Sequence, residues 1–213
     1  MRPLFEGLAR DDLAAYHAAR YVPNNAAVVL CGAFDAAESR ALVEKYFGAL
    51  KPGRLPTPNI AAEPPQLAAR VLTEQGDVNV VRGVAAYRVP HLAHPDSPAL
   101  DLLSLALGGG QASILWQKLR EEKKLVHDIH AGNWNPGDAG LCWISYTCHA
   151  GKRAAVEAAI AEELAGVARK GVSAEMVARA RRQILVSEVD SRRSVSGQAS
   201  RLGHGEVVLG DLD

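Results

Sequence analysis

The sequence predicts an α+β fold in which a largely antiparallel sheet carries helices packed on one side. Strand-length apolar stretches recur along the chain, and most are followed by a segment with apolar residues at helical spacing. The two strongest strand candidates, residues 126–134 and 140–149, are joined by Asn135-Pro136-Gly137-Asp138, a combination typical of a tight turn. Tight turns join antiparallel strands, whereas parallel strands need long crossovers, so an antiparallel sheet is expected.

The N-terminal part begins with a short predicted helix at residues 11–20. Residues 26–31 form an apolar run of strand length, and Asp35 with Glu38 makes a capping-box pattern that predicts the start of a second helix. That helix carries an apolar stripe made of Leu42, Val43, Tyr46, Phe47 and Leu50. We therefore expect a strand followed by an amphipathic helix here.

Residues 51–66 predict a linker, because they contain five prolines and show no hydrophobic periodicity. The prolines are Pro52, Pro56, Pro58, Pro64 and Pro65. We place a domain boundary at this linker. The expected organisation is a first part at residues 1–50, the linker at 51–66, and a second domain at 67–213 that is incomplete at its C-terminal end.

The second domain is expected to open with two strands, at residues 69–73 and 78–88. Ser97-Pro98 is then expected to cap a helix that runs to Leu107, with proline at its first position, where it is tolerated. After the pair of strands described above, a long helix ends at Gly171, and Ser173 begins another. The apolar stripe of the long helix is formed by Val156, Ile160, Leu164 and Val167.

Three consecutive glycines, Gly108, Gly109 and Gly110, follow the helix that ends at Leu107. Glycine destabilises a helix interior, so the helix must stop there. Ser113 is placed to cap the next helix, whose apolar face contains Ile114, Leu115 and Leu119. A tight turn between two helices explains the glycines on its own. A phosphate-binding P-loop is excluded, because no Lys-Ser/Thr pair follows them.

The charge balance argues against recruitment of nucleic acid or of an anionic membrane surface. Lys and Arg together number 24, as do Asp and Glu, and aromatic residues make up only 5% of the chain. Arginines of residues 179–193 alternate with acidic residues, as on a solvated helix face. No apolar run is long enough for a membrane span, and the N-terminus is not typical of a signal peptide. The compartment stays open.

No metal site is expected within this chain. His127 and His130 would point to opposite faces of a strand, and His91 and His94 lie in a loop. Cys142 and Cys148 lie roughly 20 Å apart along an extended strand, too far to form a disulfide. Together with Cys31, they are expected to be buried reduced thiols.

The order of four segments resembles that of the pitrilysin/insulinase family of zinc metallopeptidases. The helix, the three glycines and the Leu-Arg-Glu and Leu-Val pairs of residues 107–126 resemble the start of that family's second domain. The segment from Tyr21-x-Pro23-Asn24-Asn25 to Tyr46-Phe47-Gly48 resembles the end of its first domain, and Gly140-Leu141 and the Ser173 helix resemble the remainder of the second. The resemblance covers nearly the whole chain in order.

The resemblance implies a mitochondrial processing peptidase-like, metallohydrolase-like fold and zinc-dependent hydrolysis of peptides or unfolded polypeptides inside a chamber. In this family the zinc-binding His-x-x-Glu-His motif precedes the Tyr-x-Pro-Asn-Asn segment, so zinc would be held upstream of this chain, and this chain would have no catalytic or metal-binding residue and no activity alone. An Arg and Tyr pair used by active members is absent, since Cys142-Trp143 follows Leu141 and residues 150–155 contain no Tyr.

By the same resemblance, Gly108, Gly109 and Gly110 are candidate substrate-binding residues, as a longer glycine-rich loop contacts substrate in mitochondrial processing peptidases. The expected partners are a peptide substrate and a zinc-bearing domain or subunit. An alternative is a non-catalytic partner or scaffold subunit of the same fold. Residues 1–50 are a candidate for self-association, because their strand lacks a sheet to join.

Overall fold

The computed structural model describes residues 2–57, 64–136 and 139–210. The chain divides into two compact units, Thr73–Ser191 and a second made of Met1–Leu72 with Arg192–Asp213. Each unit is described separately below.

No helix of the described residues is both long and apolar enough to cross a membrane. The boundaries predicted at residues 50 and 66 remain a prediction, and residues 58–63 of the linker lie outside the described residues.

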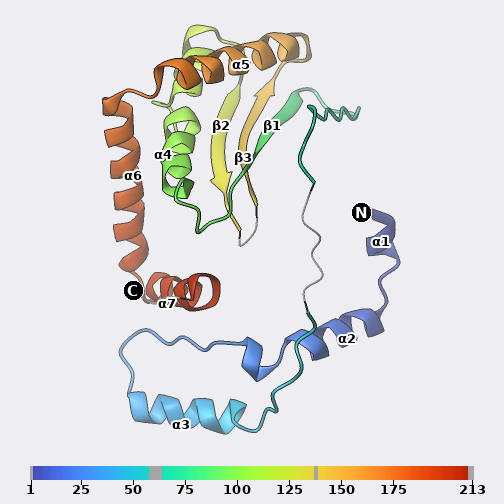
Figure 1. Ribbon diagram of the computed structural model, residues 1–213, viewed down its shortest axis with the longest axis vertical. Helices are drawn as coiled ribbons and strands as arrows, with labels where there is room; N and C mark the ends of the chain where they lie inside the picture. The colour runs from blue at the N-terminus through green and yellow to red at the C-terminus, as the bar shows by residue number, and fades with distance from the viewer. Residues whose placement is uncertain (1, 58–63, 137–138, 211–213) are drawn as a thin grey trace. The chain divides into compact units, whose positions relative to one another are not determined.

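The unit of residues 73–191 contains a three-stranded antiparallel sheet in the order β1-β3-β2, with helices beside it (Figure 1). The predicted α+β fold is therefore confirmed. Its elements are β1 (Val81–Val89), α4 (Ser97–Gly108), η2 (Trp116–Glu122), β2 (Asp128–Trp134), β3 (Gly140–Cys148), η3 (Ala150–Lys152), α5 (Arg153–Lys170) and the greater part of α6 (Ala174–Arg192).

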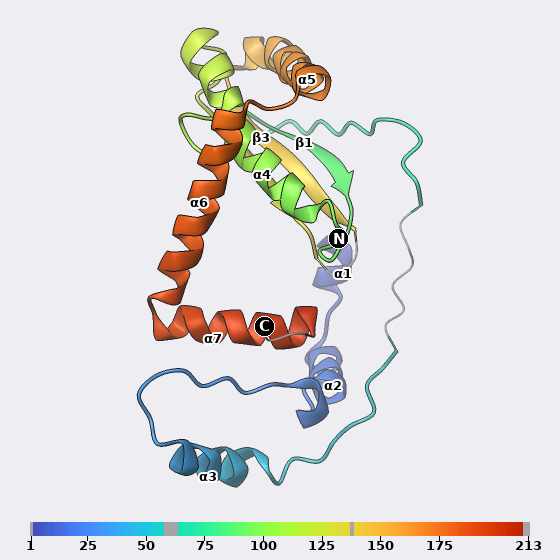
Figure 2. The ribbon, with the colours of Figure 1, turned by 60° about the vertical axis from the view of Figure 1, so that its left-hand side comes forward.

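The core lies between one face of the sheet and the helices. Alternate residues of β3, namely Ile144, Tyr146 and Cys148, are buried, together with Ile129 of β2. Helical residues close the cluster from the other side: Leu107, Leu115, Trp116, Leu119, Val156, Ala159 and Ile160. Figures 1 and 2 show α4 running beside β2, and α5 crossing the end of the sheet at which β3 finishes. Burial of helical stripes against alternating strand residues stabilises this unit.

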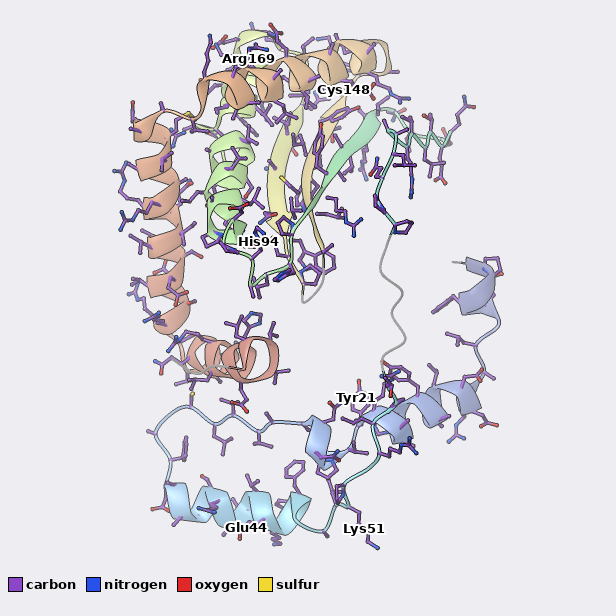
Figure 3. The ribbon with its side chains drawn as sticks, viewed as in Figure 1. Tyr21, Glu44, Lys51, His94, Cys148 and Arg169 are labelled. Carbon is purple, nitrogen blue, oxygen red and sulfur yellow. The ribbon has the colours of Figure 1, made fainter. Side chains whose placement is uncertain are left out.

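Figure 3 marks the two ends of the sheet. Cys148 lies at the end nearest α5, and His94 lies at the opposite end, in the connection between β1 and α4. The turn predicted at residues 135–138 is at the His94 end, and its residues 137–138 lie outside the described residues.

The predicted strand at residues 69–73 is wrong, and β1 begins at Val81 rather than at Val78. Val71 and Leu72 are 79% and 83% exposed, so this apolar stretch has neither a partner strand nor a helix to cover it. A strand needs a neighbour to bond its N–H and C=O groups. The apolar character of the stretch predicted a strand that the described sheet does not include.

Both serine caps predicted for the unit are also wrong. Asp96, not Ser97, precedes α4, and the Ser97 hydroxyl donates to the His91 carbonyl over 2.9 Å. The Ser113 hydroxyl donates to the Gly110 carbonyl over 2.6 Å instead of accepting from the next helix. In both cases the hydroxyl donates a hydrogen bond to a backbone carbonyl of the preceding loop. By contrast, the helix predicted to start at Ser173 does follow it as α6, and the Ser173 hydroxyl accepts from the Met176 N–H over 3.3 Å.

The other unit contains helices α1 (Arg2–Glu6), α2 (Arg10–Arg20), α3 (Ala36–Phe47) and α7 (Val195–His204), with short turns η1 (Pro23–Asn25) and η4 (Gly205–Leu209). Asp35 caps α3, accepting from the Glu38 N–H over 2.8 Å. Residues 26–31 do not form the predicted strand. Of the side chains described in this unit none is buried, and the predicted stripe of α3 stays largely uncovered, with Tyr46 67% and Phe47 51% exposed.

Candidate functional site

The glycine-rich loop at the end of α4 contains three glycines that the local structure requires for different reasons. A Cβ on Gly108 would lie 2.0 Å from the Ala131 backbone nitrogen of β2, so only glycine allows this approach of helix to strand. A Cβ on Gly109 would lie 2.6 Å from the Leu105 carbonyl oxygen. Gly110 has a φ of +95°, a conformation that favours glycine. The predicted helix-ending turn is therefore confirmed.

Hydrogen-bond donors reach the carbonyl groups of this loop. The Gln183 side chain of α6 donates to the Gly109 carbonyl over 3.3 Å, and the Arg179 guanidinium donates to the Ala112 carbonyl. The Gln117 side chain donates to the Gln111 carbonyl over 2.7 Å. The loop thus contacts α6 through its carbonyl groups, while its Gly109 and Gly110 N–H groups donate to the Leu105 and Gly108 carbonyls over 2.8 and 3.1 Å.

The sheet has a second face, opposite α4 and α5, that no helix of residues 73–191 covers apart from a contact of the His130 ring with Trp116 of η2. We call it the open face. It consists of Arg82, Val84, Ala86 and Arg88 of β1, Leu141, Trp143, Ser145 and Thr147 of β3, and Asp128, His130, Gly132 and Trp134 of β2. Large apolar side chains are exposed on it: Val84 is 69%, Trp134 62% and Leu141 44% exposed. Large exposed apolar patches are typical of interaction sites.

The strand register divides the open face into two halves. Ala86, Trp143 and Gly132 lie side by side across the three strands, with Arg88, Leu141 and Trp134 in the next row. We call these two rows, which are apolar except for Arg88, the apolar half. Toward the other end of the strands, two rows form the polar half: Arg82, Thr147 and Asp128, then Val84, Ser145 and His130.

Trp143 and Gly132 form the floor of the apolar half. A Cβ on Gly132 would lie 2.5 Å from Cζ2 and 2.7 Å from Cε2 of the Trp143 indole. The ring therefore lies across the β2 backbone in space that any other residue at position 132 would occupy. This packing leaves Trp143 half-buried and holds the indole in place on the strand.

The polar half contains a contact between the His130 and Asp128 side chains, with 3.1 Å between Nε2 and Oδ2. Ser145 is opposite His130 in the register, which brings together the residue types of a nucleophilic triad. No hydrogen bond joins Ser145 to His130 among the described residues, and the side chains of His130 and Asp128 are about half exposed, at 50% and 47%. A triad needs a bonded nucleophile and base, so this arrangement supports binding rather than catalysis.

A separate polar cluster lies at the covered face of the sheet. The Tyr146 hydroxyl donates to Glu157 Oε1 over 3.0 Å, and Arg153 Nε donates to the same oxygen over 2.8 Å. Burial, with the added effect of Glu157, raises the pKa of Tyr146 to about 12, whereas the hydrogen bond from Arg153 lowers the pKa of Glu157. A Cβ on Gly83 would lie 2.1 Å from the Tyr146 ring, so this cluster also fixes β1 against β3.

No group of three or more His, Cys, Asp or Glu side chains in the described parts of the chain could hold a metal ion. The His127 ring contacts that of His149, 4.4 Å between centroids, and not that of His130. The three cysteines are free thiols, with Cys148 buried and Cys31 and Cys142 half-buried. Burial raises the pKa of the Cys142 and Cys148 thiols. The described residues do not fit a zinc site.

The sequence profile of the family described as "Peptidase M16 inactive domain" matches residues 7–184. The chain belongs to this family. The match covers both the glycine-rich loop and the three strands of the open face, and it confirms the resemblance to the pitrilysin/insulinase zinc peptidases.

Several curated relatives are named as zinc proteases. An uncharacterized zinc protease of Mycobacterium leprae is 29% identical over 210 residues, covering 95% of this chain and 46% of the relative. Zinc protease PqqE of Helicobacter pylori is 33% identical over 134 residues, covering 61% of this chain and 30% of the relative. The chain thus spans about half the length of the first of these relatives and less of the second.

Solved structures share the fold. A protease from Helicobacter pylori matches with a TM-score of 0.86 at 24% identity, covering 97% of this chain and 50% of that one. A peptidase M16 inactive domain from Pseudomonas fluorescens matches with a TM-score of 0.76 at 20% identity, covering 94% and 48%. At these identities the likeness establishes the fold and no more.

Sequence reasoning singled out the glycine loop but missed the open face. Gly108 and Gly109 face β2 and the end of α4, and only Gly110 is exposed. The signal for the open face was present in β1 and β3, where alternation leaves Val84, Leu141 and Trp143 on the side away from the core. In an antiparallel sheet the face away from the core is usually polar. Apolar residues at the alternate positions of that face could therefore have indicated the open face from the sequence.

Proposed function

We propose that this chain is the non-zinc half of a zinc-dependent metalloendopeptidase, and that its open face lines the chamber that encloses a peptide or unfolded polypeptide. The observation that carries the proposal is the exposed apolar surface of the sheet, on a chain of the M16 inactive-domain family. Zinc would polarise the scissile carbonyl and activate water in the other half of the enzyme. No step of that chemistry is assigned to residues of this chain.

Family membership supports the division of labour. The relatives of this chain carry the name zinc protease and are about twice its length, while the described residues here do not fit a zinc site. We therefore assign zinc to a domain or subunit outside these residues. The intact protein is proposed to be active, and this chain alone to be inactive.

The glycine-rich loop is proposed to make fewer contacts with the peptide than the open face does. Three of its carbonyls already accept hydrogen bonds from Gln117, Arg179 and Gln183. The Gly109 and Gly110 N–H groups already donate to Leu105 and Gly108, so the backbone N–H groups of Gln111 and Ala112 are the proposed donors to a peptide carbonyl. Substrate binding by Gly108, Gly109 and Gly110 stays a proposal. The buried position of Gly108 makes it the weakest of the three candidates.

A second candidate function is a non-catalytic partner or scaffold subunit of the same fold. It is supported by the absence of a fitting metal cluster in the described residues and by an open face that could seat peptides without cleaving them. In this case the peptide would bind, and no zinc-dependent cleavage would follow.

Self-association through residues 1–50 is also proposed. Val28 and Leu30 are 53% and 50% exposed on an unpaired extended segment, which gives a second copy an edge to pair with. Light scattering on the 213-residue chain with and without residues 1–50 tests this. Loss of a dimer on deletion supports the proposal, and a monomer in both cases contradicts it.

The main test measures zinc content and peptidase activity in the full-length protein. We expect stoichiometric zinc and cleavage of an unfolded fluorogenic polypeptide that stops on addition of a chelator. Zinc-free full-length protein that binds the polypeptide without cleaving it would favour the scaffold. Absence of both binding and cleavage would contradict both functions.

A further inference from the structure

The apolar half of the open face has a composition and geometry that indicate which part of a peptide it contacts. Two of the chain's three tryptophans lie there, and Leu141 and Ala86 complete the surface. The third, Trp116, is in the core. A pair of indoles on a sheet provides a broad surface for large side chains.

Trp143 and Trp134 differ in packing and exposure, and the difference matters for binding. The Trp143 indole is held over Gly132, so it loses little freedom when a ligand covers it. Trp134 is 62% exposed and lies diagonally across the sheet, next to Leu141 in the register. Together they provide one packed and one exposed indole to a ligand.

We propose that the apolar half is a subsite for one large apolar side chain, aromatic or branched, of an extended polypeptide. This subsite rests on the proposed function, because it names the residue class that the chamber wall selects. The neighbouring polar half, with Ser145, Thr147 and the Asp128–His130 pair, contacts the polar backbone and small residues that flank the apolar side chain.

A permanent protein interface explains the surface less well. The buried centre of a stable interface is depleted of charge, whereas here Arg88 shares a row with Leu141 and Trp134, and Ser145 and His130 lie in the row beside that of Trp143. Such a surface tolerates water when it is empty. It therefore suits an occupant that arrives and leaves, as a substrate does.

The test uses the full-length protein with its zinc removed by chelator, so that peptides bind without being cleaved. The probes are fluorescein-labelled peptides of Gly, Ser, Thr and Lys, each carrying a single Phe at one position, and the same peptide without Phe. Fluorescence anisotropy gives the affinity of each. We expect the best Phe peptide to bind more tightly than the parent.

Trp143→Ala and Trp134→Ser are each expected to reduce that preference by about three- to tenfold, as for loss of one aromatic contact, and to leave binding of the Phe-free peptide unchanged. Tyr87→Ser is the matched control and keeps the preference, because Tyr87 is an aromatic residue of β1, 49% exposed, on the other face of the sheet. Because Trp134 is largely exposed, Trp134→Ser tests the subsite even where Trp143→Ala affects folding.

Three outcomes overturn the subsite. The preference for Phe persists in both tryptophan variants, or the wild type shows no preference while binding all peptides. Alternatively, both variants lower the melting temperature of the peptide-free protein and leave peptide selectivity intact, which assigns the face to a permanent interface. Failure of the wild type to bind any peptide is a different result, since it contradicts the proposed function itself.

Discussion

Residues 73–191 and residues 1–72 both contain apolar runs of strand length, yet only the first group buries them. In β3, Ile144 and Tyr146 are 1% and 5% exposed, whereas Val28 and Leu30 of the 26–31 run are 53% and 50% exposed. The β3 run is paired on both sides, with β1 and β2. The 26–31 run pairs with no strand in the described residues.

The difference shows that an apolar run forms a strand only where neighbouring strands bond its backbone groups and helices cover its side chains. A central strand bonds its backbone groups on two sides and buries its side chains under helices. A run without neighbours keeps its apolar side chains in water, and it becomes a surface for another chain or domain. This reasoning applies equally to the open face of the sheet.

The largest effect is expected from truncating the core of residues 73–191. Leu119→Ala removes a side chain that is 0% exposed, and should lower the free energy of unfolding by about 2–5 kcal/mol. Leu42→Ala, at a position 44% exposed in α3, is the matched control and should change it by less than about 0.5 kcal/mol. Urea denaturation of the 213-residue chain measures both. Equal effects would contradict the contrast between the two regions.

The second effect concerns Tyr146 at high pH. Its folded-state pKa of about 12 lies above the ordinary 10.0, so the neutral form stabilises the fold. This stabilisation is complete below pH 10 and is lost as the pH rises toward 12, by up to about 2–3 kcal/mol. The measurement is the free energy of unfolding as a function of pH.

Tyr146→Phe should remove that part of the alkaline loss, whereas Phe in place of the half-exposed Tyr87 should leave it unchanged. If wild type and Tyr146→Phe lose stability in parallel between pH 10 and 12, the assignment to Tyr146 is wrong.

A smaller effect is expected from adding one methyl group to the glycine loop. Gly108→Ala forces α4 away from the Ala131 backbone and should cost about 1–3 kcal/mol. Gly151→Ala is the control, because a Cβ there meets nothing within 4 Å, and it should stay within about 0.5 kcal/mol. Thermal melting of each variant checks this. A neutral Gly108→Ala would mean that close helix–strand packing does not explain the glycine.

Cutting the chain within the linker should have the smallest effect on the fold of the sheet. Limited proteolysis is expected to cut first between residues 51 and 66 and to leave the fragment that contains the sheet folded. A first cut within residues 126–149 would contradict both the predicted boundary and the greater stability of the sheet.

The sequence predicted the parts of the fold that local chemistry determines. The Asp35 cap, the end of α5 at Gly171 and the strands β2 and β3 all follow from residues close in sequence. It did not predict the unpaired state of residues 26–31 and 69–73, because pairing depends on strands elsewhere. The Trp143–Gly132 contact depends on register in the same way, so the apolar half of the open face became visible only in the structure.

Cysteine protection in the full-length, zinc-depleted protein tests most directly whether the open face meets the peptide. Val84→Cys places a thiol on the open face, and Ala158→Cys places one on the exposed side of α5 as a matched control. A saturating unfolded polypeptide is expected to slow alkylation at position 84 and not at position 158. Slowing at position 158 alone, or at neither position, would contradict the assignment of the open face to the peptide chamber.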